Sequence, residues 1–157
     1  MRLKHSRHRA RRGTAVVEAA IVLPIYLMVL FAVFEFGHAQ LVINLLNSAC
    51  RNGARIGSTE GTTTDDVIAR VNQTMGTVVP ANKVQIFVKD ASVFDAEGTP
   101  PSTDSGVEGL PDQEVSDAEP RQLFVVRAKV AYNDVLLVPM PFLSGVMLDS
   151  QAFMRHE

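Results

Sequence analysis

A long apolar run near the N-terminus constrains this chain more than any other feature. From Val16 to Phe36 the sequence is apolar except for Glu18 and Glu35. At 1.5 Å per residue, a helix of this length covers about 30 Å, the thickness of the hydrocarbon core of a bilayer. We therefore predict one membrane-spanning helix over about residues 16–36, in which Pro24 is tolerated as a kink.

The charges are divided sharply between the two sides of this run. Six basic residues precede Gly13, whereas all 17 acidic residues follow it, against nine of the 15 Lys and Arg. The positive-inside rule then predicts a single-pass protein of the cytoplasmic (inner) membrane, with its N-terminus in the cytoplasm and its C-terminal part outside. We expect the lipid bilayer as a partner and no nucleic acid, because the basic residues stop where the apolar run starts and no aromatic residue is interleaved with them.

The helical pattern continues beyond the membrane segment. Apolar and small residues recur at steps of three and four, which gives one stripe made of Val42, Leu45, Leu46, Ala49, Gly53 and Ile56. Gly57 followed by Ser58 and Thr59 is a plausible stop. We predict one helix over residues 14–57, with its second half outside the membrane.

The remaining residues, 58–157, predict a small exported α+β domain. "TTTDDVIARVNQTM" predicts a short helix with Thr64 as N-cap and one apolar face made of Val67, Ile68, Val71 and Met75. Three segments alternate as strands do, "KVQIFVKDASVF", "LFVVRAKVAYN" and "VMLDSQAFMR". The predicted fold class is thus α+β, a long N-terminal helix packed on a small antiparallel sheet with one short extra helix.

Residues 95–120 differ in composition from the rest of this domain. They contain eight acids, four prolines and no base, so we expect a solvated acidic loop that buries little apolar surface. Asp95 and Glu97 before Gly98 faintly resemble a calcium-binding loop, which leaves a calcium site as an alternative.

No catalytic motif is present, and we expect neither an enzyme nor a cofactor. The chain lacks G-x-S-x-G, H-E-x-x-H, C-x-x-C and a phosphate-binding glycine loop, and its four histidines lack metal-ligand spacing. The single cysteine, Cys50, excludes an internal disulfide, and we expect a small buried side chain there.

Gly13, Thr14 and Glu18 explain why a membrane segment keeps a carboxylate. A cut after Gly13 would make Thr14 the new N-terminus, directly before the membrane helix, which is the pattern of a class III signal sequence cut by a prepilin peptidase. The new α-amino group is a positive charge that needs a partner in an apolar setting. Glu18, one helical turn on, can pair with it or with the amine of an adjacent subunit.

The same residues resemble a known family. "RRGTAVVEAAIVLPIYLMVLFAVFEFGHA" is similar to the N-terminus of TadE-like pseudopilins of the tight-adherence (Flp) pilus, and "ACRNGARIGS" resembles that family's segment after the membrane helix. The resemblance implies processing between Gly13 and Thr14, an assembly role for Glu18 and a helix-end motif at Gly53-Ala54-Arg55. It also implies a prepilin peptidase, other pilins and pseudopilins, and the inner-membrane pilus machinery as partners.

Two other interpretations of the N-terminus remain open. An uncleaved signal anchor would tether an exported binding or sensor domain, and an ordinary signal peptide would be cut near Gly37-His38-Ala39. The spacing of Ala49, Gly53 and Gly57 by four residues likewise has two explanations. These residues allow either another chain or this chain's own sheet to approach closely.

Overall fold

The computed structural model describes residues 8–95, 106–137 and 145–157, with the backbone alone for residues 8–12. Its helices are α1 (His8–Gly57) and α2 (Thr64–Met75), and its strands are β1 (Val84–Asp90), β2 (Leu123–Ala131) and β3 (Met147–Arg155). The chain divides into two compact units, Met1–Gly37 and His38–Glu157, called here the N-terminal unit and the sheet unit. The predicted α+β fold class is confirmed.

The described part of the N-terminal unit is helical throughout. Helix α1 begins at His8, six residues before the predicted start at residue 14. No proline interrupts residues 8–13, and one interior glycine costs a helix only about 1 kcal/mol, so the helix extends into the basic segment. Pro24 lies inside α1.

The sheet is antiparallel, with the strand order β1-β2-β3. In the register of β1 and β2, Val84 lies opposite Val130 and Asp90 opposite Phe124. Strand β3 follows with Leu123 opposite Arg155 and Ala131 opposite Met147. All three predicted strands are therefore present. The first ends earlier than the pattern indicated because residues 92–94 form a 3-10 turn, and the third starts after Val146.

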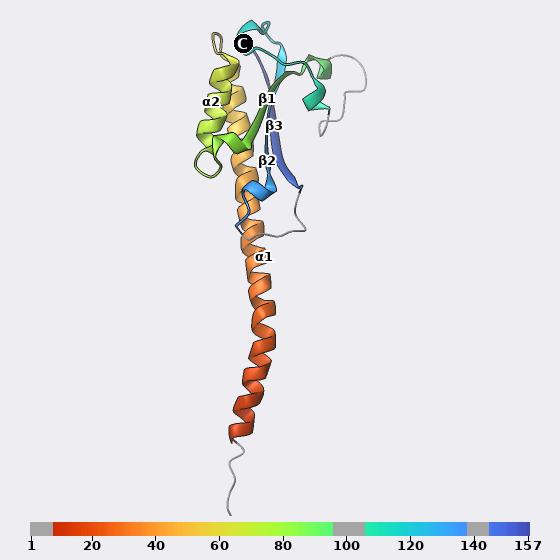
Figure 1. The fold of residues 1–157 in the computed structure, drawn as a ribbon. Helices are drawn as coiled ribbons and strands as arrows, with labels where there is room; N and C mark the ends of the chain where they lie inside the picture. Colours follow the sequence, from red (N-terminus) through yellow and green to blue (C-terminus); the bar gives the residue numbers. More distant parts are fainter. Residues whose placement is uncertain (1–7, 96–105, 138–144) are drawn as a thin grey trace, which may run out of the picture. The chain divides into compact units, whose positions relative to one another are not determined.

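Helix α2 and the second half of α1 lie on one face of this sheet (Figure 1). The predicted stripe of α1 contributes fully buried Val42, Leu46 and Ala49, and β2 contributes Phe124, Val126, Ala128 and Val130, all 0% exposed. At about 25 cal/mol per Å² of apolar surface removed from water, this contact is the main stabilising term of the sheet unit.

Helix α2 begins with a capping box. The Thr63 hydroxyl accepts a hydrogen bond from the Asp66 backbone N–H, and the Asp66 carboxylate accepts one from the Thr63 N–H. The N-cap is thus Thr63 and the predicted Thr64 is wrong by one residue, because Thr64 has Val67 three positions on, whereas Thr63 has Asp66, which completes the box. The predicted apolar face is buried at Val67, Val71 and Met75.

The acidic segment is more ordered than a solvated loop. Residues 106–120 run along β1, where the Asp90 N–H donates to the Pro111 carbonyl (2.9 Å) and the Gln113 N–H to the Val88 carbonyl (3.2 Å). Val107 and Val115 are 0% exposed. The prediction of a loop that buries little apolar surface is therefore wrong for residues 106–120, and residues 96–105 lie outside the described part.

Candidate functional site

The predicted processing and assembly residues lie on α1 in the N-terminal unit. Gly13, Thr14 and Glu18 are all exposed, and a Cβ built on Gly13 would meet no atom within 4 Å. Thr14 and Glu18 are separated by four residues, so they share one helix face about 6 Å apart along the axis. A carboxylate at this spacing is within reach of an amine at residue 14.

The apolar residues that follow are exposed as well. Val16 is 69%, Met28 73% and Phe34 64% exposed, and α1 is long and apolar enough from Gly13 onward to cross a membrane. This many exposed large apolar side chains on one helix is typical of a segment that crosses a membrane or packs against other apolar helices.

The helix-end motif lies in the sheet unit and packs inward. A Cβ on Gly53 would come within 2.7 Å of Val71 Cγ2, and one on Gly57 within 2.9 Å of Val67 Cγ2 and 3.2 Å of the Phe124 ring. Of the three motif residues, Gly53 and Ala54 are buried and Arg55 is exposed. The small residues therefore let α2 and β2 approach α1 within this chain, which leaves Arg55 as the member of the motif that faces solvent.

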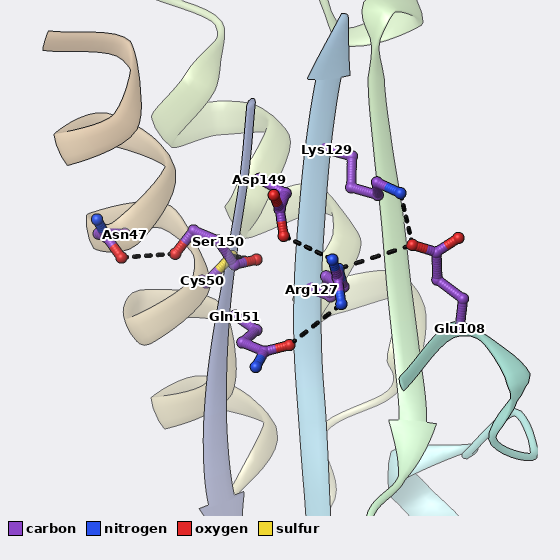
Figure 2. Close-up of polar contacts among 8 residues, drawn as sticks. All are labelled: Asn47, Cys50, Glu108, Arg127, Lys129, Asp149, Ser150 and Gln151. Atoms are coloured by element: carbon purple, nitrogen blue, oxygen red, sulfur yellow. Dashed lines mark hydrogen bonds and ion pairs between the residues drawn. The ribbon is translucent and has the colours of Figure 1, made fainter. Parts of the chain in front are cut away.

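Cys50 is buried, as predicted, and joins α1 to β3. Its Sγ–H donates to the Ser150 carbonyl at 3.3 Å, and the Ser150 hydroxyl donates to Asn47 Oδ1 at 2.6 Å (Figure 2). A buried thiol with a backbone partner of this kind is a packing element.

The face of the sheet opposite the helices, called here the outer face, carries a network of charges. Arg127 of β2 donates from Nη2 to Asp149 Oδ2 at 2.6 Å and from Nη1 to Gln151 Oε1 at 3.4 Å, both on β3 (Figure 2). Its side chain is only 4% exposed, and Glu108 of the acidic segment lies 3.8 Å from its Nε. Buried cations need such partners, because an isolated charge in a protein interior costs several kcal/mol.

Glu108 also binds a second cation on the same face. Lys129 Nζ donates to Glu108 Oε1 at 2.5 Å, and this hydrogen bond lowers the pKa of the Glu108 carboxyl below its ordinary value. Lys89 of β1 pairs with Asp112 at 2.7 Å. The acids of residues 106–120 thus neutralise the basic residues of the outer face.

The alternative of a calcium site gains no support from Asp95. Both of its carboxylate oxygens accept hydrogen bonds from Arg155, at 2.8 and 2.9 Å, while Glu97 lies outside the described residues. Within the described part of the chain, no group of three or more His, Cys, Asp or Glu is arranged to hold a metal ion.

The sequence analysis did not predict the outer-face network. A signal for it exists in β2, where Arg127 and Lys129 alternate with inward apolar residues and require anionic partners if their face is covered. The acids that supply those partners stand in a separate segment, marked only by its composition.

Comparison with known proteins identifies the N-terminal segment. Residues 13–55 match the family model of TadE-like proteins. The match begins at Gly13, includes Glu18 and ends at Arg55, two residues before α1 ends. Neither a curated protein nor a solved structure matches the chain. The resemblance drawn from the sequence is confirmed, and residues 13–55 form a TadE-like segment.

Proposed function

We propose that this chain is a minor pilin-like subunit, a pseudopilin, that takes part in the assembly of a tight-adherence type IV pilus and has no catalytic role. The observation that carries the proposal is the TadE-like match, which starts at Gly13 and contains Glu18 and the exposed apolar stretch of α1. In this role the stretch lies first in the inner membrane and then contacts the helices of other pilins. A prepilin peptidase cuts between Gly13 and Thr14.

Processing gives Glu18 its task. The cut creates an α-amino group at Thr14, and Glu18 lies one turn further on the same face of α1. Two unit charges about 4 Å apart attract by about 4 kcal/mol at the effective dielectric constant of about 20 that describes partly solvated sites. The pair lowers the cost of holding the amine in an apolar setting.

The same carboxylate specifies register between subunits. When helices pack side by side, Glu18 of one subunit meets the Thr14 amine of its neighbour only at one axial offset. At any other offset, two desolvated charges are left without partners, at a cost of several kcal/mol. Charge pairing of this kind adds specificity to a contact that is otherwise apolar and non-directional.

Processing is tested by the N-terminal residue of the mature protein, determined by intact mass in cells with and without the peptidase. We expect Thr14 when the peptidase is present. Met1 in both strains would favour the uncleaved anchor with an exported binding or sensor domain, and a start near Gln40 would favour a secreted product. A Gly13→Arg variant should stay full length and still enter the membrane, because its apolar stretch is unchanged.

Assembly is tested with Glu18→Gln, which removes the charge and keeps the shape. This variant should be inserted and cut, but its recovery with other pilus components should fall at least tenfold, since about 1.4 kcal/mol of lost coupling already changes an equilibrium by that factor. Glu18→Asp is the matched control, which retains a carboxylate and should recover part of the association. Normal association of Glu18→Gln would reject the pairing role.

A further inference from the structure

The peptide bond that the proposed processing step breaks lies inside a helix. Helix α1 begins at His8 and continues through Gly13 and Thr14 to Gly57. In an α-helix, each carbonyl accepts a hydrogen bond from the N–H group four residues further on. The carbonyl of Gly13 is thereby directed to the N–H of residue 17, and the N–H of Thr14 to the carbonyl of residue 10. Both groups of the bond to be cut are therefore engaged within the helix.

A peptidase must reach both of these groups. Hydrolysis breaks the C–N bond between Gly13 and Thr14, adds the OH of a water molecule to the Gly13 carbonyl carbon and transfers its proton to the Thr14 nitrogen. An extended main chain presents its N–H and C=O groups to a binding partner, whereas a helix keeps them for itself. Local opening of α1 exposes the bond.

Gly13 is a weak point of the helix at the position of the cut. It is the only glycine between His8 and Phe36. Its φ is not positive, and a Cβ built on it would meet no described atom within 4 Å. At Gly53 and Gly57, by contrast, a Cβ would meet side chains at 2.7 and 2.9 Å. Packing within the described chain therefore explains the glycines at 53 and 57 but not the one at 13.

The charges before Gly13 weaken the same end of α1. The sequence places Arg9, Arg11 and Arg12 near the start of the helix, and its first turn contains no acid. Positive charges at a helix N-terminus oppose the macrodipole. The opposite limit is set by the predicted membrane part, which starts at residue 16, because an open backbone in lipid leaves its polar groups unpaired. Opening from the N-terminus therefore ends close to the cut.

We propose that a prepilin peptidase cuts this chain only after α1 has opened from its N-terminus as far as Thr14, and that Gly13 serves by making this opening more frequent. The inference rests on the processing step of the proposed function. Helix–coil relaxation takes about a microsecond or less, which is far faster than a typical enzyme turnover of about 10 per second. The cleavage rate then follows the population of the open form.

Two alanines of α1 provide a matched pair of variants. Ala10 lies in the part that opens, and Ala20 lies beyond the cut in the apolar stretch. Replacement of either by glycine weakens the helix by the same chemical change. Full-length protein in lipid vesicles is mixed with purified peptidase, and intact mass gives the cleavage rate. Amide hydrogen exchange at Thr14 and Val17, without peptidase, gives the open population.

We expect Ala10→Gly to raise both the amide exchange and the cleavage rate by up to about fivefold, the factor by which glycine disfavours a helix relative to alanine. Ala20→Gly should leave the cleavage rate unchanged. Cleavage of Ala10→Gly at the wild-type rate, despite faster exchange, would overturn the inference. Unchanged exchange in Ala10→Gly would also overturn it, because the helix would then not be closed at the cut.

Gly13→Ala tests the role of the glycine itself. This variant should lower both amide exchange and cleavage by about fivefold, and adding Ala10→Gly to it should return both to near the wild-type values. If exchange recovers but cleavage does not, the opening role of Gly13 is wrong and the peptidase recognises the glycine directly. Wild-type protein that the peptidase leaves uncut would refute the processing step itself, and with it this inference.

Discussion

Gly53 offers the sharpest test of how the TadE-like segment is used. Adding one methyl group there distinguishes close packing within this chain from close approach of another chain. A Cβ at this position would lie 2.7 Å from Val71 Cγ2, 3.4 Å from Val67 Cγ1 and 3.7 Å from Val126 Cγ1. Carbon atoms make their best contacts at about 3.5–4.0 Å, so the first of these distances is a steric overlap. Gly53→Ala must displace α2 or rotate Val71.

The expected loss follows from two opposing effects. Val71 is 0% exposed and branched at Cβ, so its side chain has one strongly preferred rotamer in a helix. Overpacking of this kind costs about 1–3 kcal/mol, while replacement of an interior helical glycine by alanine contributes about 1 kcal/mol of stability. We expect Gly53→Ala to lower the free energy of unfolding by about 1 kcal/mol, which lowers Tm by about 4 °C for a unit of this size.

Cys50 supplies the assay. It is the only cysteine of the chain and is 0% exposed, so a thiol reagent labels it when the sheet unit opens. The urea midpoint of Cys50 labelling should fall for Gly53→Ala in the detergent-solubilised full chain. Asn52→Ala is the matched control on the same turn, because Asn52 is exposed and the change should raise stability by a few tenths of a kcal/mol.

A second background isolates the overlap. In Val71→Ala protein, Cγ2 is absent, so the added methyl at Gly53 should become neutral or stabilising, and the two substitutions should show a coupling of about 1 kcal/mol or more. If Gly53→Ala instead stabilises the wild-type chain as Asn52→Ala does, the tight packing is refuted. A loss of pilus association without loss of stability would then assign Gly53 to a partner.

Two further expectations concern the sheet unit. The hydrogen bond from Lys129 lowers the pKa of Glu108. The stability that the ionised Glu108 contributes is therefore present above the ordinary glutamate pKa of about 4.3 and is lost as pH falls through the lowered value. The urea midpoint should fall less steeply with acid in Glu108→Gln than in wild type. Thr63→Ala removes the N-cap of α2 and should cost about 1 kcal/mol in the same unfolding measurement, whereas Thr62→Ala, one residue before the cap, should cost less.

The elements of the sheet unit could be predicted because each carries its own periodicity. In residues 42–56 of α1, apolar and small residues recur at steps of three and four. In β2, the inward residues recur at steps of two, and all four of them are fully buried: Phe124, Val126, Ala128 and Val130. These patterns follow from local geometry alone. The N-cap of α2 was missed by one residue, because three consecutive threonines offer the same capping chemistry, and the structure uses Thr63 with Asp66.

The covering of the outer face could not be predicted, because it depends on contacts between distant segments. Composition suggested that residues 95–120 stay in solvent, yet Val107 packs with Ala91 and Val125, and the acids pair with Lys89, Arg127 and Lys129. The apolar residues in this segment are few, and backbone hydrogen bonds to β1 together with the charge pairs hold the segment against the sheet. A count of acids cannot distinguish a solvated loop from one that neutralises a basic sheet.

The two halves of α1 show how burial within one chain distinguishes two kinds of apolar residue. Those buried within the chain serve its own packing, and exposed ones are candidates for contact with a membrane or another subunit. Leu46, Ala49 and Ala54 are 0% exposed, so sheet packing within the same subunit accounts for their small or apolar character. Val16 and Met28 are 69% and 73% exposed, and no part of the described chain accounts for theirs. An apolar surface of that extent is maintained only where lipid or another helix covers it. Glu18 is a carboxylate on that surface, and this is the physical reason to look for its partner at the proposed new N-terminus, Thr14, in the bilayer or in a pilus.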